Sequence, residues 1–196
     1  MKVAKDTVKP LSDVDVRKML KAPNMKIYAG FRDFTSMILI LDCGIRVGEL
    51  LDLTINDVDL KLGLINIRAI VSKTRVDRTV PISKKTCKLL GELIKSIEDS
   101  KCDFIFQSSY GGKLDKLQIT KNYEKYGKRV GLKVKCTPYV FRHTFATNFV
   151  KQGGDVFTLQ RIMGHTNIST TRQYVQLDKD DLIIKHRQVV SIDKYI

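Results

Sequence analysis

The sequence lacks a long apolar run, paired cysteines and any flexible linker. Its longest apolar stretch, residues 37–41, is far shorter than the roughly 20 residues that span a bilayer, and its N-terminus has no apolar segment of the kind that directs secretion. The four cysteines stand far apart, without the short spacing of a zinc or redox motif. No stretch rich in Ser, Gly or Pro divides the chain. We therefore expect one cytosolic globular unit with reduced cysteines, no bound metal and no membrane partner.

Acidic residues are in deficit: 35 Lys and Arg stand against 21 Asp and Glu, for a formal net charge of +14. Such an excess attracts polyanions, because binding them releases condensed counterions. No basic amphipathic segment with an aromatic-rich opposite face favours a membrane surface. The charge is also spread along the whole chain rather than kept in a tail. Nucleic acid is therefore the leading expected partner.

Apolar periodicity predicts an α+β fold that is mainly helical, with a small antiparallel β-sheet made of a hairpin plus a short strand. Phe34, Ile38 and Leu41 recur at helical spacing and mark a core helix, which Gly44 is expected to end. Helices are expected over residues 13–21, 31–42, 45–51, 83–97, 115–131, 138–152, 155–163 and 168–176. Strands are expected over residues 64–71, 79–82 and 104–106. A basic turn at residues 72–78 would join the first two strands into the hairpin.

Polar residues near the C-terminus are of the types needed to hold and attack a phosphodiester. Arg142 and His165 can bind phosphate oxygens, and Tyr174 offers a phenol. Cleavage without metal requires a nucleophile, cationic groups, a proton donor for the leaving alkoxide and preorganised geometry. Arg46 and Lys73 can complete such a set, because a guanidinium donates bidentately and a lysine can also give up a proton. From these residues alone, Tyr174 could equally be a core aromatic of a packed helical subdomain.

Four blocks of the sequence together resemble the signature boxes of the tyrosine recombinases, the phage integrase family. The blocks are residues 41–53, 142–147, 163–165 and 170–174. They stand in the family's order and spacing, and the hairpin segment that ends at residues 78–81 also resembles the family's. The likeness extends from about residue 11 to residue 176. Several boxes at the correct separations are much stronger support than any one of them.

The resemblance implies a role for each matching residue. Arg46 and Arg142 would clamp the scissile phosphate. Tyr174 would attack it, forming a 3′-phosphotyrosyl bond and releasing a 5′-hydroxyl. Lys73, on the β-turn, would protonate the leaving 5′-oxygen, and His165 would donate a hydrogen bond to the phosphate. Because the phosphotyrosine stores the energy of the broken bond, rejoining would need no ATP, metal or other cofactor.

Tyr139 departs from the family pattern, which usually has histidine, or sometimes lysine, three residues before the second arginine. A phenol can donate a hydrogen bond to phosphate but is a poor proton acceptor at neutral pH, so we expect retained but slower cleavage. Glu49, one helical turn after Arg46, is expected to orient charged neighbours, and His143 to be a buried hydrogen-bonding residue. The further DNA contacts expected are Arg75, Arg78 and Arg172. Two of these share the turn of Lys73, which makes the lysine the least specific assignment.

These residues lead us to expect a site-specific DNA recombinase of the integrase or excisionase type, serving a mobile element. A type IB topoisomerase would share the chemistry, and a DNA-binding module with weakened catalysis is a third possibility that Tyr139 alone supports. Residues 11–177 would form the catalytic domain, after a linker remnant at 1–10 and before a tail at 178–196 that could pass to a neighbouring protomer. Because the family usually carries an N-terminal DNA-binding domain, the chain is expected to be a fragment. Expected partners are double-stranded DNA, further copies of the chain in a tetramer on DNA, and accessory DNA-bending proteins.

Overall fold

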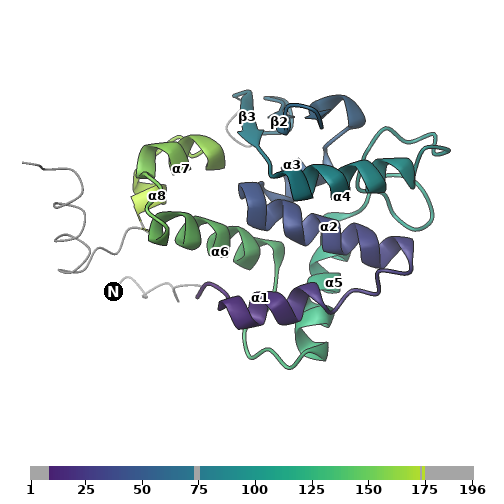
Figure 1. Cartoon of the computed structure of the whole chain (residues 1–196), viewed down its shortest axis with the longest axis horizontal. Helices are drawn as coiled ribbons and strands as arrows, with labels where there is room; N and C mark the ends of the chain where they lie inside the picture. Colours follow the sequence, from purple (N-terminus) through teal and green to yellow (C-terminus); the bar gives the residue numbers. More distant parts are fainter. Residues whose placement is uncertain (1–8, 73–75, 173, 175–196) are drawn as a thin grey trace, which may run out of the picture.

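The computed structural model describes residues 9–72, 76–172 and 174. Within this part of the chain, helices surround one long helix and a small sheet lies to one side (Figure 1). The elements are α1 Asp13–Leu20, α2 Tyr28–Cys43, α3 Val47–Leu51, the 3-10 helix η1 Ile55–Asp57, β1 Val58–Asp59, β2 Leu64–Ile67, β3 Arg78–Pro81, α4 Lys84–Lys95, α5 Lys116–Arg129, α6 Pro138–Lys151, α7 Val156–Met163 and α8 Ser169–Arg172. The mainly helical α+β class is confirmed. No helix among the described residues is both long and apolar enough to cross a membrane.

Helix α2 is the centre of the main core, and it packs against α4 and α6 and also contacts α1 and α5 (Figure 1). Its Met37, Leu39 and Ile40 are fully buried. The helix ends at Gly44, as expected, in the left-handed conformation at φ 63°. A Cβ at Gly44 would lie 2.3 Å from the ring of Phe145 on α6, so only glycine lets the chain turn this close to α6. The end of α2 is thereby placed directly beside α6.

The sheet has the order β1-β2-β3, and both of its strand pairs are antiparallel. The hairpin is confirmed, with Ile65 paired to Val80. The first strand is shorter than expected, because the backbone N–H groups of Val71 and Ser72 bond back to the carbonyl of Arg68 and close a turn. Ile70, which was expected in that strand, is 87% exposed.

The third strand comes from a different segment than expected. Val58 and Asp59 form it, whereas Phe104 makes only an isolated bridge to Thr54. Residues 104–106 do not alternate between buried and exposed, since two of the three are completely buried. The expectation of a strand at 104–106 was therefore wrong: these residues are an irregular core segment, although their apolar character suits a buried strand equally well.

A second, smaller cluster of apolar side chains joins α6 and α7 to Tyr174, which follows α8. Its buried members are Phe145, Ala146, Val150, Leu159, Met163 and Tyr174. The N-terminus of the domain is fixed to the same helix, because the backbone N–H of Leu11 donates to the Thr144 hydroxyl at 2.9 Å. Helix α7 also contacts β3. The candidate site lies where this smaller cluster meets the main core.

Candidate active site

Three segments that lie far apart in the sequence bring polar side chains together beside α6. Arg142 comes from α6, Arg46 stands at the N-terminus of α3, and His165 follows Gly164 at the end of α7. Both segments that meet α6 follow a glycine in the left-handed conformation, Gly44 before Arg46 and Gly164 before His165. These tight helix ends let α3 and the residues after α7 begin next to the guanidinium of Arg142.

Arg142 is the most buried cation of the group, with 7% of its surface exposed. Its guanidinium donates to the carbonyl of Gly44, to the carbonyl of Met163 at 2.9 Å and to Nε2 of His165 at 3.1 Å. Burial, followed by the positive charge of Arg46, lowers the pKa of Arg142 to about 9. The side chain thus stays charged at neutral pH and is held from both sides.

Arg46 and Glu49 form a compact pair at the start of α3. The Arg46 guanidinium donates to Glu49 Oε1 at 2.9 Å and to the Gly164 carbonyl at 2.9 Å, and the Arg46 backbone N–H donates to Glu49 Oε2 at 3.0 Å. Burial opposes the ionisation of Glu49, but the hydrogen bonds and charge of Arg78, together with those of Arg46, hold its pKa below the ordinary value. Glu49 thus contacts two charged neighbours, and its expected role in orienting them stays a prediction.

Arg78 binds Glu49, a contact that the sequence did not indicate. It was expected to contact DNA, but its guanidinium faces inward and binds both oxygens of Glu49, at 2.9 and 2.6 Å. Its Nε donates to the carbonyl of Ile162 at 3.0 Å. The base of the hairpin is therefore tied to both α3 and α7. No local sequence signal could have found this contact, because it joins residues 29 positions apart.

His165 is half-buried and bonded through both ring nitrogens. Nε2 faces Arg142, and Nδ1 lies 2.9 Å from the hydroxyl of Thr171 on α8. Burial first, and then the charges of Arg142, Arg46 and Arg78, lower the pKa of His165 to about 4. The imidazole is thus neutral at physiological pH. Because a guanidinium can only donate, Nε2 accepts from Arg142 and the ring proton is on Nδ1.

The ring of His143, on α6, lies near the rings of both candidate tyrosines. The ring of His143 is 5.1 Å from that of Tyr174 and 6.5 Å from that of Tyr139, centroid to centroid. Tyr174 is 8% exposed and packs in the smaller apolar cluster, so it has the core contacts of a packed aromatic. It is also among the groups that act on the pKa of Arg142, although less strongly than burial. The candidate nucleophile and the candidate clamp therefore share one substructure.

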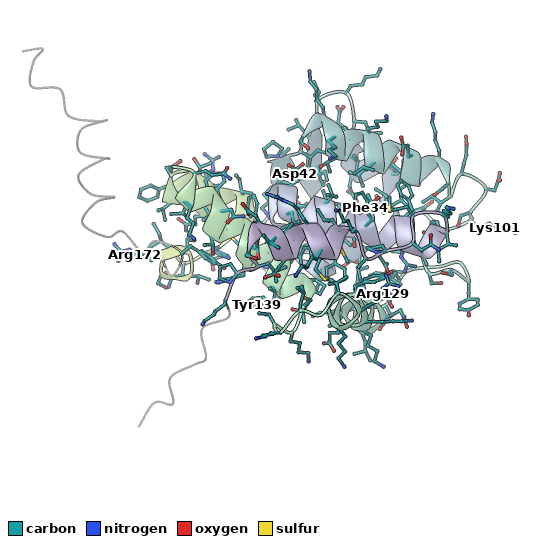
Figure 2. All side chains as sticks on the ribbon, turned by 60° about the horizontal axis from the view of Figure 1, so that its bottom comes forward. Phe34, Asp42, Lys101, Arg129, Tyr139 and Arg172 are labelled. Carbon is teal, nitrogen blue, oxygen red and sulfur yellow. The ribbon has the colours of Figure 1, made fainter. Side chains whose placement is uncertain are left out.

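Tyr139 is open to solvent, with 56% of its surface exposed, and it lies near the start of α6, where Figure 2 labels it. Arg172, also labelled there, is exposed on α8. Lys73 and Arg75 lie outside the described residues, as does the tail after residue 174. The roles given to these residues, and the hydrogen-bonding role of His143, stay predictions.

A hollow of about 920 Å³ lies between β3 and α7, beside the polar group. Its lining includes Arg78, Thr79, Arg161, Gly164, His165 and Thr166. Within the described ranges, no three His, Cys, Asp or Glu side chains converge as metal ligands would. The site instead offers guanidinium groups, a neutral imidazole and a phenol. This donor set suits an anionic ester.

Residues 9–181 match the family model described as the phage integrase family. Tyrosine recombinase XerC of Thermodesulfovibrio yellowstonii is 30% identical over 194 residues, which cover 93% of this chain and 62% of the relative. Tyrosine recombinase XerA of Saccharolobus solfataricus is 32% identical over 192 residues, covering 97% of this chain and 60% of the relative. The chain thus spans about three fifths of the length of these curated relatives.

Solved structures resemble this fold closely. The crystal structure of XerA recombinase aligns with a TM-score of 0.77 at 31% identity, covering 95% of this chain and 65% of that one. XerH recombinase bound to its difH substrate in a pre-cleavage complex aligns with a TM-score of 0.78 at 25% identity, covering 96% of this chain and 56% of that one. The Tn1549 transposon integrase in complex with transposon right end DNA has a TM-score of 0.84 at 19% identity over 97% of this chain and 69% of that one, a likeness of fold alone.

Proposed function

The chain belongs to the phage integrase family, and on that premise we propose that it is the catalytic core of a site-specific DNA recombinase. It would cut and rejoin double-stranded DNA through a 3′-phosphotyrosyl intermediate on Tyr174. The observation that carries this proposal is the convergence of Arg46, Arg142 and His165 beside the substructure that holds Tyr174. These residues were singled out from separate sequence boxes, and the fold brings them together.

Two fixed guanidinium groups would bind the non-bridging oxygens of the scissile phosphate. Arg46 and Arg142 are held by backbone carbonyls before any substrate is present, so little reorganisation is needed on binding. Their charge would also favour ionisation of the Tyr174 phenol, whose ordinary pKa near 10 otherwise limits attack at neutral pH. Attack by the phenolate on phosphorus would form the tyrosyl ester and expel the 5′-oxygen.

The leaving 5′-oxygen needs a proton, which we assign to Lys73. The support is indirect: Lys73 falls between β2 and β3 in the sequence, and Arg78 ties the base of that hairpin to Glu49 in the site. His165 would hydrogen-bond the phosphate, and Tyr139 would donate to it from the exposed side. Reversal of the same steps with a new 5′-hydroxyl would reseal the strand, without metal or ATP.

We further propose that the working assembly is a tetramer of protomers on two DNA duplexes, serving integration or excision of a mobile element. The relatives and structural neighbours are recombinases and integrases, several of them solved on DNA, and the charge of +14 suits that partner. Arg172, exposed on α8, would add a contact to the phosphate backbone of the DNA.

Covalent trapping tests the proposal. The chain is incubated with a pool of duplexes that carry a nick next to the scissile position and randomised arms, so that cleavage releases a short strand and leaves the protein attached. An adduct that survives denaturant and maps to Tyr174 is expected, and Tyr174→Phe should abolish it. Tyr110→Phe, at a fully exposed tyrosine, is the matched control and should retain it.

Two other results would redirect the assignment. If no Tyr174-dependent adduct forms with any duplex although DNA is bound, the chain is a binding module rather than an enzyme. If single protomers relax any supercoiled plasmid, the activity is that of a type IB topoisomerase.

A further inference from the structure

Among the described residues, Thr171 is the hydrogen-bond partner of the His165 ring on the side away from Arg142. It is fully buried on α8, and its hydroxyl lies 2.9 Å from Nδ1 of His165. Its backbone carbonyl accepts the N–H of Tyr174 at 3.0 Å. One residue therefore touches both the candidate phosphate-binding imidazole and the segment that carries the candidate nucleophile.

The hydrogen bonds around His165 specify which nitrogen carries the proton. Arg142 has donors only, so Nε2 must offer its lone pair, and Nδ1–H donates to the Thr171 hydroxyl. In this state His165 cannot donate to a phosphate through Nε2, which is the role proposed for it. Binding a phosphodiester therefore requires a proton on Nε2.

A hydroxyl can hold the ring in both states. When Nδ1 is protonated, the Thr171 oxygen accepts. When the proton leaves Nδ1 for water and another arrives from water at Nε2, the ring stays neutral and the hydroxyl turns to donate to Nδ1. A valine in its place could do neither, and a backbone carbonyl could only accept.

We propose that Thr171 is a positioning residue that holds His165 through Nδ1 and lets the imidazole present a proton to the scissile phosphate from Nε2, an inference that rests on the proposed function. The charged groups that act on this imidazole are Arg142 from α6, which contacts it, Arg46 and Glu49 from the start of α3, and Arg78 from β3. Three of the four are cations, which disfavour a second proton that would charge the ring, so the ring exchanges between its two neutral tautomers. Of the two ring contacts found in the described part of the chain, the Thr171 hydroxyl is the neutral one, and it can serve either tautomer.

Thr171→Val tests the hydroxyl alone, because valine has nearly the same shape and keeps the backbone bond to Tyr174. Thr171→Ser restores the hydroxyl. Thr170→Val makes the same change at the neighbouring exposed threonine and is the matched control. Circular dichroism and thermal unfolding establish that each variant is folded before it is compared.

The first measurement needs no DNA. The ¹⁵N shifts of the His165 ring, assigned with a His165→Asn variant, report which nitrogen is protonated. We expect protonation on Nδ1 in the parent, Thr171→Ser and Thr170→Val, and a shift toward Nε2 or a mixture of tautomers in Thr171→Val. An unchanged Nδ1 tautomer in Thr171→Val would overturn the inference.

The second measurement is the rate of adduct formation on the nicked duplexes. Loss of one hydrogen bond of ordinary strength corresponds to about a tenfold fall in rate, which we expect for Thr171→Val, with recovery in Thr171→Ser and no change in Thr170→Val. A Thr171→Val rate within twofold of the control would also overturn the inference. If the parent forms no adduct, the proposed function fails, while the ring shifts still decide whether Thr171 sets the tautomer.

Discussion

Replacing Glu49 by glutamine should destabilise the folded protein strongly at neutral pH. The Glu49 carboxylate accepts four hydrogen bonds, two from Arg46 and two from Arg78, and its side chain is only 2% exposed. Glutamine keeps the size of the side chain and one acceptor oxygen. Its amide nitrogen, however, would point N–H groups at guanidinium donors. Two cations would then face a neutral group in a buried site.

The magnitude follows from the burial of the pair. Removing one partner of a buried ion pair costs about 3–5 kcal/mol, because the other charge is left uncompensated. Glutamine retains some of the bonds, so we expect a loss of about 3 kcal/mol in the free energy of unfolding, within the 5–15 kcal/mol typical of a domain. Urea denaturation at pH 7, with the dependence on denaturant held common to both proteins, measures it.

The loss should also depend on pH in a defined direction. The folded-state pKa of Glu49 lies below its ordinary value of 4.5. Its stabilising contribution is therefore complete above about pH 4.5 and disappears as the pH falls through the lowered value. The difference between the parent and Glu49→Gln should shrink over the same acidic range, where both proteins carry a neutral side chain at this position.

Glu124→Gln is the matched control, because Glu124 pairs with Lys135 at 3.1 Å on the surface, where Lys135 is 75% exposed. Such pairs contribute little, so the control should lose no more than about 0.5 kcal/mol. A Glu49→Gln variant as stable as this control would refute the reasoning. A loss that persists undiminished below the pH at which the folded protein protonates Glu49 would show that shape, rather than charge, makes Glu49 necessary.

Three further predictions concern the same site. Gly164→Ala should lose about 1–2 kcal/mol of unfolding free energy, because φ is 61° and a Cβ would lie 3.0 Å from the Arg78 guanidinium. In the same denaturation assay Gly48→Ala, where the added Cβ meets open space, should be neutral or slightly stabilising. Equal effects of the two substitutions would contradict this. Tyr139→His should form the DNA adduct faster than the parent. The free energy of unfolding should change by less than about 0.5 kcal/mol, because the side chain is exposed. Slower cleavage would show instead that the phenol is adapted to this position. His165 should titrate near pH 4 by NMR in the DNA-free protein. Because the imidazole of the unfolded chain is protonated at a higher pH than that of the folded protein, stability should fall as the pH drops from 6.5 toward 4. A titration midpoint near 6.5 would rule out the argument that burial lowers the pKa of His165.

Local patterns predicted those parts of the fold that local interactions determine. The core helix and its end at Gly44 follow from apolar spacing and from a glycine that can adopt positive φ. The hairpin follows from alternating apolar residues on both sides of a basic turn. The false strand at residues 104–106 had the same apolar character, but its pairing depends on segments distant in the sequence. Periodicity carries no information about those partners.

The predictions for the site divide in the same way, into those that local sequence determines and those that depend on packing. Arg46, Arg142, His165 and Tyr174 were found because they belong to sequence boxes, and the boxes encode the helix ends that bring three of them together. Arg78 was assigned to DNA because it is basic and near a turn. Its actual contact with Glu49 is decided by how the hairpin packs on α3 and α7, which no one-dimensional pattern contains.

In the proposed reaction, the charge of the assembled site would favour the transition state over the bound substrate. Three guanidinium groups, those of Arg46, Arg78 and Arg142, meet one carboxylate, that of Glu49, so two positive charges remain uncompensated. A phosphodiester in the ground state carries one negative charge, and in-line attack by a phenolate brings a second to the phosphorus centre. Two fixed positive charges in a buried setting match the second state better than the first, which is the differential binding that accelerates a reaction. A neutral His165 fits this balance, because a further cation at the same place would strengthen ground-state binding and add repulsion when no DNA is present.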